Sequence, residues 1–203
     1  MKKIAVILSL LLGVVLIASP GFAQLRGGGF LLAFSYYVPT AENVSNGYGS
    51  TIGFVLPVRN RLQLALEWKY AQHSVTKVEG GFLNGDLFVT PLLLSARYSF
   101  VDEANFVPYV FGGFGWFFAH FNALERQSID EVTVVKQDPK DGLGVFGGLG
   151  AHIRASNSLA FFGEALYLYR TTKVETVYLI GPSETFSVDL SSLSVQVGLR
   201  YFY

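Results

Sequence analysis

Cysteine is absent from this 203-residue chain, and charged side chains are scarce. Without cysteine the chain can form no disulfide, no cysteine-bound zinc or iron–sulfur centre and no lipid anchor of the lipoprotein kind. Charged residues make up 15% of the chain, whereas about 25% is usual in soluble domains. Because 15 basic residues balance 15 acidic ones, there is no positive field to attract nucleic acid.

A long hydrophobic run is also missing once the first 23 residues are set aside. The densest apolar stretch, 106–121, contains Pro108 and several glycines, which disfavour a helix. Yet hydrophobic residues reach 51% and aromatic residues 15%, a composition that favours strands. A chain that is too apolar for a soluble surface and has no helical span can cross a bilayer as a closed β-barrel.

The first 23 residues have the layout of a secretory signal peptide. Lys2 and Lys3 precede an apolar run over 4–18, and Gly21 and Ala23 supply the small residues of a cleavage site. The apolar run, about 15 residues, is shorter than the roughly 20 that a membrane helix needs. We therefore expect a signal peptide at 1–23, an outer-membrane β-barrel domain at 24–203, and export to the outer membrane of a Gram-negative cell.

Turn residues divide the rest of the chain into eight strand-like segments. We expect strands at 28–38, 48–58, 62–75, 86–100, 106–121, 142–155, 159–174 and 190–203. The connections between them alternate between long and short, and the longest is 122–141. Short periplasmic turns and long external loops produce this alternation. The predicted fold is all-β: an eight-stranded antiparallel up-and-down transmembrane β-barrel, preceded by a cleavable signal peptide, with solvated external loops.

Alternating side chains indicate which face of each strand meets lipid. Over 62–71, leucines, Trp68 and Tyr70 occupy one face, and Glu67 and Lys69 occupy the other. A soluble ligand-carrying barrel would turn the apolar face inward, whereas a membrane barrel turns it outward. Because each strand carries so few charges, we place the apolar face in lipid. The segment 106–121 is apolar on both faces, and its parity stays open.

The end of the chain resembles the closing strand of bacterial outer-membrane barrels. The stretch 195–203 reads Val-Gln-Val-Gly-Leu-Arg-Tyr-Phe-Tyr, with apolar residues at alternate positions up to a final aromatic. The glycine- and aromatic-rich stretches 108–115, 147–153 and 161–169 resemble the small-barrel family that includes the membrane domain of OmpA and OmpX. The resemblance implies an outer-membrane barrel whose last strand is read by the barrel-assembly machinery. The assembly signal would comprise Leu199, Tyr201 and Tyr203.

Polar side chains that face the lumen form the candidate site. An eight-stranded barrel is just wide enough inside for side chains to fill, and buried charges need partners. We expect a polar network that plugs the lumen, made of Glu67, Lys69, Arg97, Glu164, Arg170 and Arg200. The leading function is then structural: an integral outer-membrane barrel whose external loops make surface contacts. The alternative is a transport channel for small hydrophobic or ionic solutes.

A lipid-modifying enzyme is the third possibility. Glu67 and Glu164 could act as paired carboxylates, but their strands are far apart around the barrel. His73 and Ser74 could serve a lipid-directed enzyme, which needs a Ser and a His within hydrogen-bond reach. The sequence has no metal-ligand spacing and no phosphate loop, so we expect no cofactor and no enzymatic activity. The expected partners are outer-membrane lipids, lipopolysaccharide and the barrel-assembly machinery.

Overall fold

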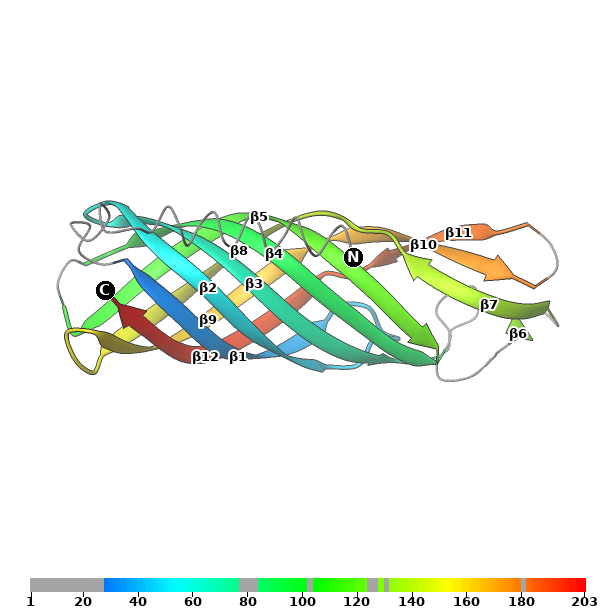
Figure 1. Ribbon diagram of the computed structural model, residues 1–203, viewed down its shortest axis with the longest axis horizontal. Coiled ribbons are helices and arrows are strands. Elements are labelled where there is room, and N and C mark those ends of the chain that lie inside the picture. Colours follow the sequence, from blue (N-terminus) through cyan, green and yellow to red (C-terminus); the bar gives the residue numbers. More distant parts are fainter. Residues whose placement is uncertain (1–27, 77–83, 102–103, 124–127, 130–131, 180–181) are drawn as a thin grey trace.

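A computed structural model describes residues 28–76, 84–101, 104–123, 128–129, 132–179 and 182–203, and the expected signal peptide lies outside them. Eight antiparallel strands close into a barrel (Figure 1), which confirms the predicted fold class. The barrel strands are β1 (Gly29–Pro39), β2 (Gly47–Arg59), β3 (Leu62–Val75), β4 (Gly85–Ser99), β5 (Phe106–Ala123), β8 (Gly142–Arg154), β9 (Leu159–Tyr169) and β12 (Ser192–Phe202). Each pairs with the next along the chain, and β1 closes the ring against β12, with Phe34 opposite Val197. Within the described ranges no helix is long and apolar enough to span a membrane.

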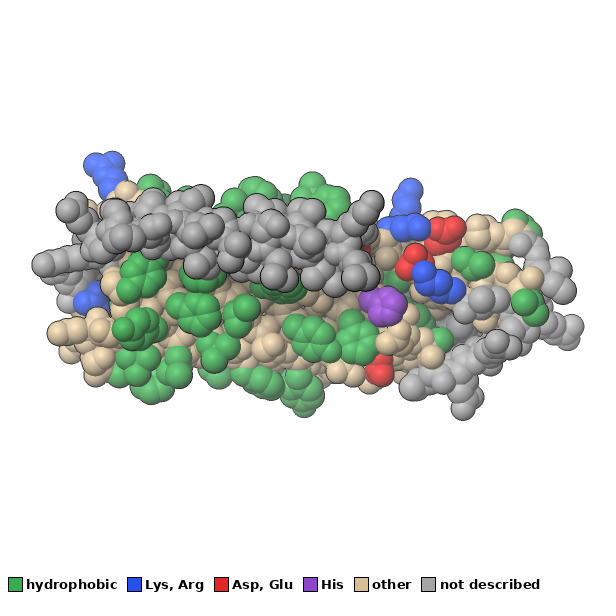
Figure 2. All heavy atoms as spheres, in the orientation of Figure 1, with side chains coloured by type: hydrophobic (Ala, Val, Ile, Leu, Met, Phe, Trp, Pro, Cys, Tyr) green, Lys and Arg blue, Asp and Glu red, His purple; other side chains and the backbone are tan. Residues whose placement is uncertain are grey.

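The outer face of the barrel is apolar. Along β1 and β12, for example, exposed residues alternate with buried ones, and the exposed set includes Phe34 at 55% and Val197 at 60%. Hydrophobic side chains gather over the barrel in Figure 2, and the charged side chains of this view gather near its two ends. Lipid is the environment in which such a surface is stable, because water would leave this apolar area unburied.

The two ends of the barrel differ. The ends of β2, β4 and β8 that lead into short connections lie where Gly29 pairs with Phe202, which we call the turn end. The opposite end, where the long connections emerge, is the loop end. In outer-membrane barrels the short turns face the periplasm and the long loops face outward.

The parity of β5 is resolved by its burial. Tyr109, Phe111 and Phe117 are buried in the lumen, whereas Phe114 and Trp116 are exposed on the outer face. Glycine and aromatic residues occur on both faces of this strand, so hydrophobicity alone could not separate them.

The prediction that 122–141 is a solvated loop is wrong over its described part. Beyond the loop end, β11 (Glu184–Asp189), β10 (Thr171–Tyr178), β7 (Val132–Pro139) and β6 (Ser128–Ile129) form a second, four-stranded sheet, the ribbon (Figure 1). The predicted strand 159–174 accordingly divides at Arg170 into β9 and β10. Lys140 and Glu175 join the ribbon strands through a hydrogen bond of 2.6 Å, which lowers the pKa of Glu175 and raises the pKa of Lys140.

The ribbon packs against the barrel at the loop end through hydrophobic side chains. Val134 from β7 and Val174 from β10 are buried there against residues of the barrel. We call this group the mouth cluster: Val44, Val75, Leu87, Phe121, Val134, Val174 and Leu190. Burying apolar side chains where the strands leave the membrane stabilises the ribbon against the barrel.

Candidate functional site

Buried charges meet in the lumen across strands β3, β4 and β9. Arg97 forms ion pairs with both Glu67 and Glu164, the latter at 2.5 Å, and Lys69 lies 3.1 Å from Glu67. All four side chains are at most 3% exposed. Two carboxylates therefore balance two cations, which is the condition under which charges are tolerated away from water.

Neutral side chains complete this layer. The Tyr109 hydroxyl donates to Glu164 at 2.6 Å, and the Gln196 amide donates to the same carboxylate. Lys69 in turn donates to the Gln196 carbonyl oxygen at 2.5 Å. We call Glu67, Lys69, Arg97, Tyr109, Glu164 and Gln196 the ionic plug. Ser35 and Thr51 hydrogen-bond to Gln196 as well, so seven of the eight barrel strands contribute to this layer.

Glu67 and Glu164 are connected through Arg97 although they lie on separate strands. Their strands are well separated around the wall, as expected, but both carboxylates reach Arg97 across the lumen. The strands are thus far apart as expected, and Arg97 links the two carboxylates. The lumen of a small barrel is narrow enough that opposite strands meet through long side chains.

Arg170 and Arg200 occupy other levels of the lumen. Arg170 lies at the loop end, donates to the Lys140 carbonyl oxygen at 2.8 Å and stacks over Phe117. Arg200 lies toward the turn end, donates to Gln63 at 3.0 Å and stacks over Phe202. The six expected lumen residues are thus all buried, but four share one ion-pair cluster.

Sequence reasoning missed Tyr109 and Gln196 as members of the plug. Gln196 could have been found, because it shares the inward parity of Arg200. Tyr109 could not, because the faces of its strand were indistinguishable.

Much of the remaining lumen is apolar, which the expected polar interior did not anticipate. On the loop side of the plug, aromatic and aliphatic residues of β4, β5, β8 and β9 pack inward: Leu93, Phe111, Phe117, Phe146, Leu166 and Leu168. On the turn side, Phe162 packs with Leu31 and Val55. Apolar side chains therefore lie on both sides of the plug, together with Arg170 toward the loop end and Arg200 toward the turn end.

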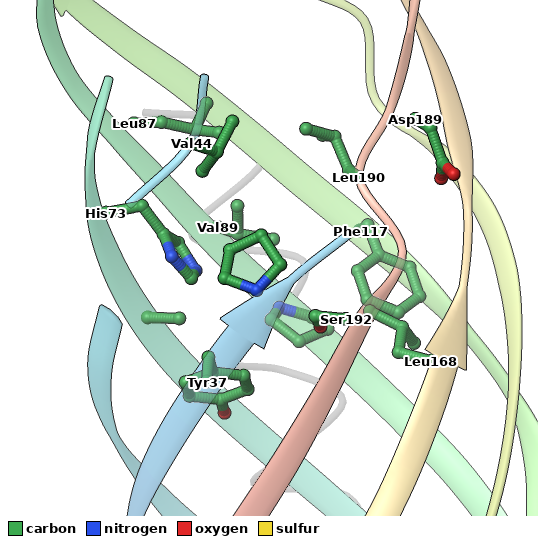
Figure 3. Close-up of a pocket in the computed structure, with 13 residues that line it drawn as sticks. Tyr37, Val44, His73, Leu87, Val89, Phe117, Leu168, Asp189, Leu190 and Ser192 are labelled. Carbon is green, nitrogen blue, oxygen red and sulfur yellow. The ribbon is translucent and has the colours of Figure 1, made fainter. Parts of the chain in front are cut away.

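A cavity lies in the lumen at the loop end (Figure 3) and encloses about 440 Å³ not filled by protein atoms, a volume that includes space open to solvent. Its lining is mostly apolar: Tyr37, Pro39, Val44, Ala71, His73, Leu87, Val89, Pro91, Phe117, Leu168, Asp189, Leu190 and Ser192. We call it the lumen cavity. It shares Val44, Leu87 and Leu190 with the mouth cluster.

The barrel is closed, but the ladder between two of its strands lapses beside this cavity, at a stretch that we call the wall gap. Strands β3 and β4 pair at Trp68 with Leu92 and again at Ala71 with Val89, but the two positions between these pairs are not bridged. Pro91 lies in this gap, and proline has no N–H to donate to a ladder. Since Ala71, Val89 and Pro91 all line the lumen cavity, the gap lies directly outside it.

The Ser–His pair needed by a lipid-modifying enzyme does not form among the described residues. His73 Nδ1 lies 3.1 Å from the Ser45 carbonyl oxygen, whereas the Ser74 hydroxyl donates to Asp86 at 3.4 Å. Likewise, no cluster of three or more His, Asp or Glu side chains that could hold a metal ion occurs in the described ranges.

Comparisons with known proteins find the architecture in solved structures. No protein-family model matches the sequence, and no curated protein matches it. The structure is similar to outer membrane protein OprG from Pseudomonas aeruginosa, with a TM-score of 0.68 and 16% identity over 88% of this chain and 97% of OprG. It is also similar to outer membrane protein AlkL, determined in lipid bilayers, with a TM-score of 0.60 and 15% identity over 88% of this chain and 91% of AlkL. Neisserial surface protein A has a TM-score of 0.58 and 14% identity over 87% of this chain and 97% of its own.

At sequence identities this low, the structural likeness establishes the fold alone. The closed eight-stranded ring and its apolar outer face agree with that likeness. The chain has the fold of the small eight-stranded outer-membrane β-barrels and is an integral outer-membrane barrel protein.

Proposed function

We propose that the protein carries small apolar molecules between the external side and the membrane, through the lumen cavity and the wall gap at Pro91. The observation that carries this proposal is the coincidence of the two: an apolar cavity lies directly behind the one stretch where β3 and β4 are unpaired. An apolar solute that leaves water for such a cavity gains free energy in proportion to the area it buries.

The ionic plug supports a sideways path over an axial one. Its charged side chains lie between the lumen cavity and the turn end, and they are tied to one another and to Tyr109 and Gln196. An apolar molecule that passed through the plug would break these hydrogen bonds and could form none in their place. Lipid beside Pro91 is therefore the favourable destination.

Replacing Pro91 with valine is expected to slow uptake of an apolar probe about fivefold. Valine has the N–H that proline lacks, and one ladder hydrogen bond of about 1 kcal/mol would reduce an open wall population by about that factor. The measurement is the rate at which N-phenyl-1-naphthylamine fluorescence rises in Gram-negative cells that express the full chain.

The matched control is Pro108→Val. Pro108 lies in β5 within an unbroken ladder, opposite Ala151, and does not line the lumen cavity. It should leave the uptake rate unchanged. Equal rates for wild type, Pro91→Val and cells without the protein would contradict the proposal.

Surface interaction through the ribbon is the second candidate function. In the ribbon, β11 pairs with β10 and has no second neighbour among the described strands. An edge strand offers backbone N–H and C=O groups to another chain. We also propose that lipopolysaccharide and outer-membrane lipids surround the apolar outer face of the barrel.

For biogenesis, we propose that the barrel-assembly machinery reads β12 and the residues that end it, with Leu199, Tyr201 and Tyr203 on the lipid face. Replacing Tyr203 with aspartate should reduce the folded fraction in membranes, measured as the heat-dependent shift in gel mobility. Tyr98→Asp is the control, because Tyr98 is also exposed and lies at the same end of the barrel, on β4. Equal losses for both variants would mean that the effect is one of charge in lipid and not of recognition.

A further inference from the structure

Two buried polar side chains in the lining of the lumen cavity have incomplete hydrogen bonding, Tyr37 and His73. The Tyr37 hydroxyl has no partner among the described residues, and Figure 3 shows it pointing away from the other labelled residues of the cavity. His73, on β3, is 6% exposed, and Figure 3 shows its imidazole ring pointing into the cavity. The ring packs against the backbone of Gly47, where an added Cβ would lie 2.5 Å from Nδ1. Glycine at this position of β2 thus makes room for the imidazole. The close contact with the Gly47 backbone holds the ring in place.

The hydrogen bond of His73 determines which nitrogen can accept. Nδ1 lies 3.1 Å from the carbonyl oxygen of Ser45. A carbonyl oxygen only accepts, so Nδ1 carries the hydrogen in this contact, and the neutral ring presents Nε2 as an acceptor. Among the described residues, no hydrogen bond to Nε2 is formed.

The other polar groups of the cavity narrow the choice of ligand. The Asp189 carboxylate, at the edge of the lining, accepts from the Ser191 amide at 2.8 Å and from the Thr40 hydroxyl at 3.4 Å. A carboxylate and a bare imidazole nitrogen both favour hydrogen-bond donors and disfavour anions. Aliphatic and aromatic side chains make up most of the remaining lining.

We infer that the lumen cavity selects uncharged apolar molecules with one hydroxyl group, which donates its hydrogen bond to His73 Nε2. This inference rests on the proposed function, since it names the class of solute that the same cavity takes. The ligand is an aliphatic alcohol or a phenol: the apolar body contacts side chains such as Val89 and Leu168, and the hydroxyl satisfies the imidazole. Hydrocarbons bind more weakly because they leave Nε2 unsatisfied, and fatty acids bind more weakly because of their charge.

Two isomers test this inference directly. Heptan-1-ol and 1-methoxyhexane have the same atoms, but only the alcohol has a donor. Each is titrated into the full chain in lipid nanodiscs, with empty nanodiscs as the baseline, while the methyl resonances of Leu87, Val89, Leu168 and Leu190 are followed by NMR. Wild type should bind the alcohol about 3- to 10-fold more tightly than the ether, the factor expected for one net hydrogen bond.

The variant His73→Phe keeps an aromatic ring and removes the acceptor. It should weaken heptan-1-ol to the affinity of the ether and leave 1-methoxyhexane within about twofold of wild type. Heat-dependent gel mobility shows whether the variant folds. If the variant does not fold, the ratio of the two isomers' affinities for the wild-type protein tests the inference. Equal affinities of the isomers in wild type, or a preference for the alcohol that survives in the folded variant, would overturn the inference alone. If neither isomer shifts the methyl resonances of the cavity residues, both the inference and the proposed function fail.

Discussion

Replacing Arg97 with methionine is expected to destabilise the barrel by about 3–5 kcal/mol, because it leaves a buried carboxylate without its cation. Arg97 is the residue that both Glu67 and Glu164 bind, and after its removal Glu164 keeps only the neutral donors Tyr109 and Gln196. The measurement is urea unfolding in lipid vesicles, followed by the fluorescence of Trp68 and Trp116, the two tryptophans of the chain.

Two further variants separate charge imbalance from lost packing. Arg154→Met removes an exposed arginine from the turn end and should change the free energy of unfolding by less than about 0.5 kcal/mol. Adding Glu164→Gln to Arg97→Met should recover much of the loss, since Glu67 still has Lys69 as its counter-ion. A double variant as unstable as Arg97→Met would show that the cost lies in packing.

Replacing Val197 with arginine should cost about 2–4 kcal/mol, the range for a cation near the middle of the lipid-facing wall. Val197 is 60% exposed, lies midway along β12 and pairs with Phe34. The same unfolding titration measures the effect. Val177→Arg makes the identical change on the exposed side of the ribbon strand β10 and should have little effect. Similar losses at both positions would contradict the assignment of the outer face of β12 to lipid.

The barrel strands were predictable because their two faces differ in residue type, which gives an alternating pattern in the sequence. Lipid selects apolar residues at alternate positions, and the lumen accepts the charged ones, so Glu67 and Arg97 could be placed inward from parity alone. Strand β5 lacked this contrast, since Phe111 in the lumen and Phe114 in lipid are the same residue type.

The candidate site was less accessible from sequence. The lumen cavity depends on inward apolar residues such as Phe117 and Leu168, which are indistinguishable by type from lipid-facing ones. The wall gap depends on the register between β3 and β4, which places Pro91 beside Ala71 and Val89, and a proline within one strand does not reveal this. The ribbon was missed because its strands lie beyond the lipid, where the apolar alternation is not required.

Closing the wall gap by a reversible covalent bond tests the account most directly. Tyr70 and Thr90 lie opposite each other by register within the unpaired stretch, and the chain has no cysteine of its own. The pair Tyr70→Cys and Thr90→Cys, oxidised to a disulfide, should reduce N-phenyl-1-naphthylamine uptake to the level of cells without the protein, and reduction should restore it. The control pair Leu64→Cys and Ala96→Cys joins the same strands where they are already paired, and should have no effect in either state. Undiminished uptake with the Tyr70–Thr90 disulfide formed would contradict a sideways path at Pro91.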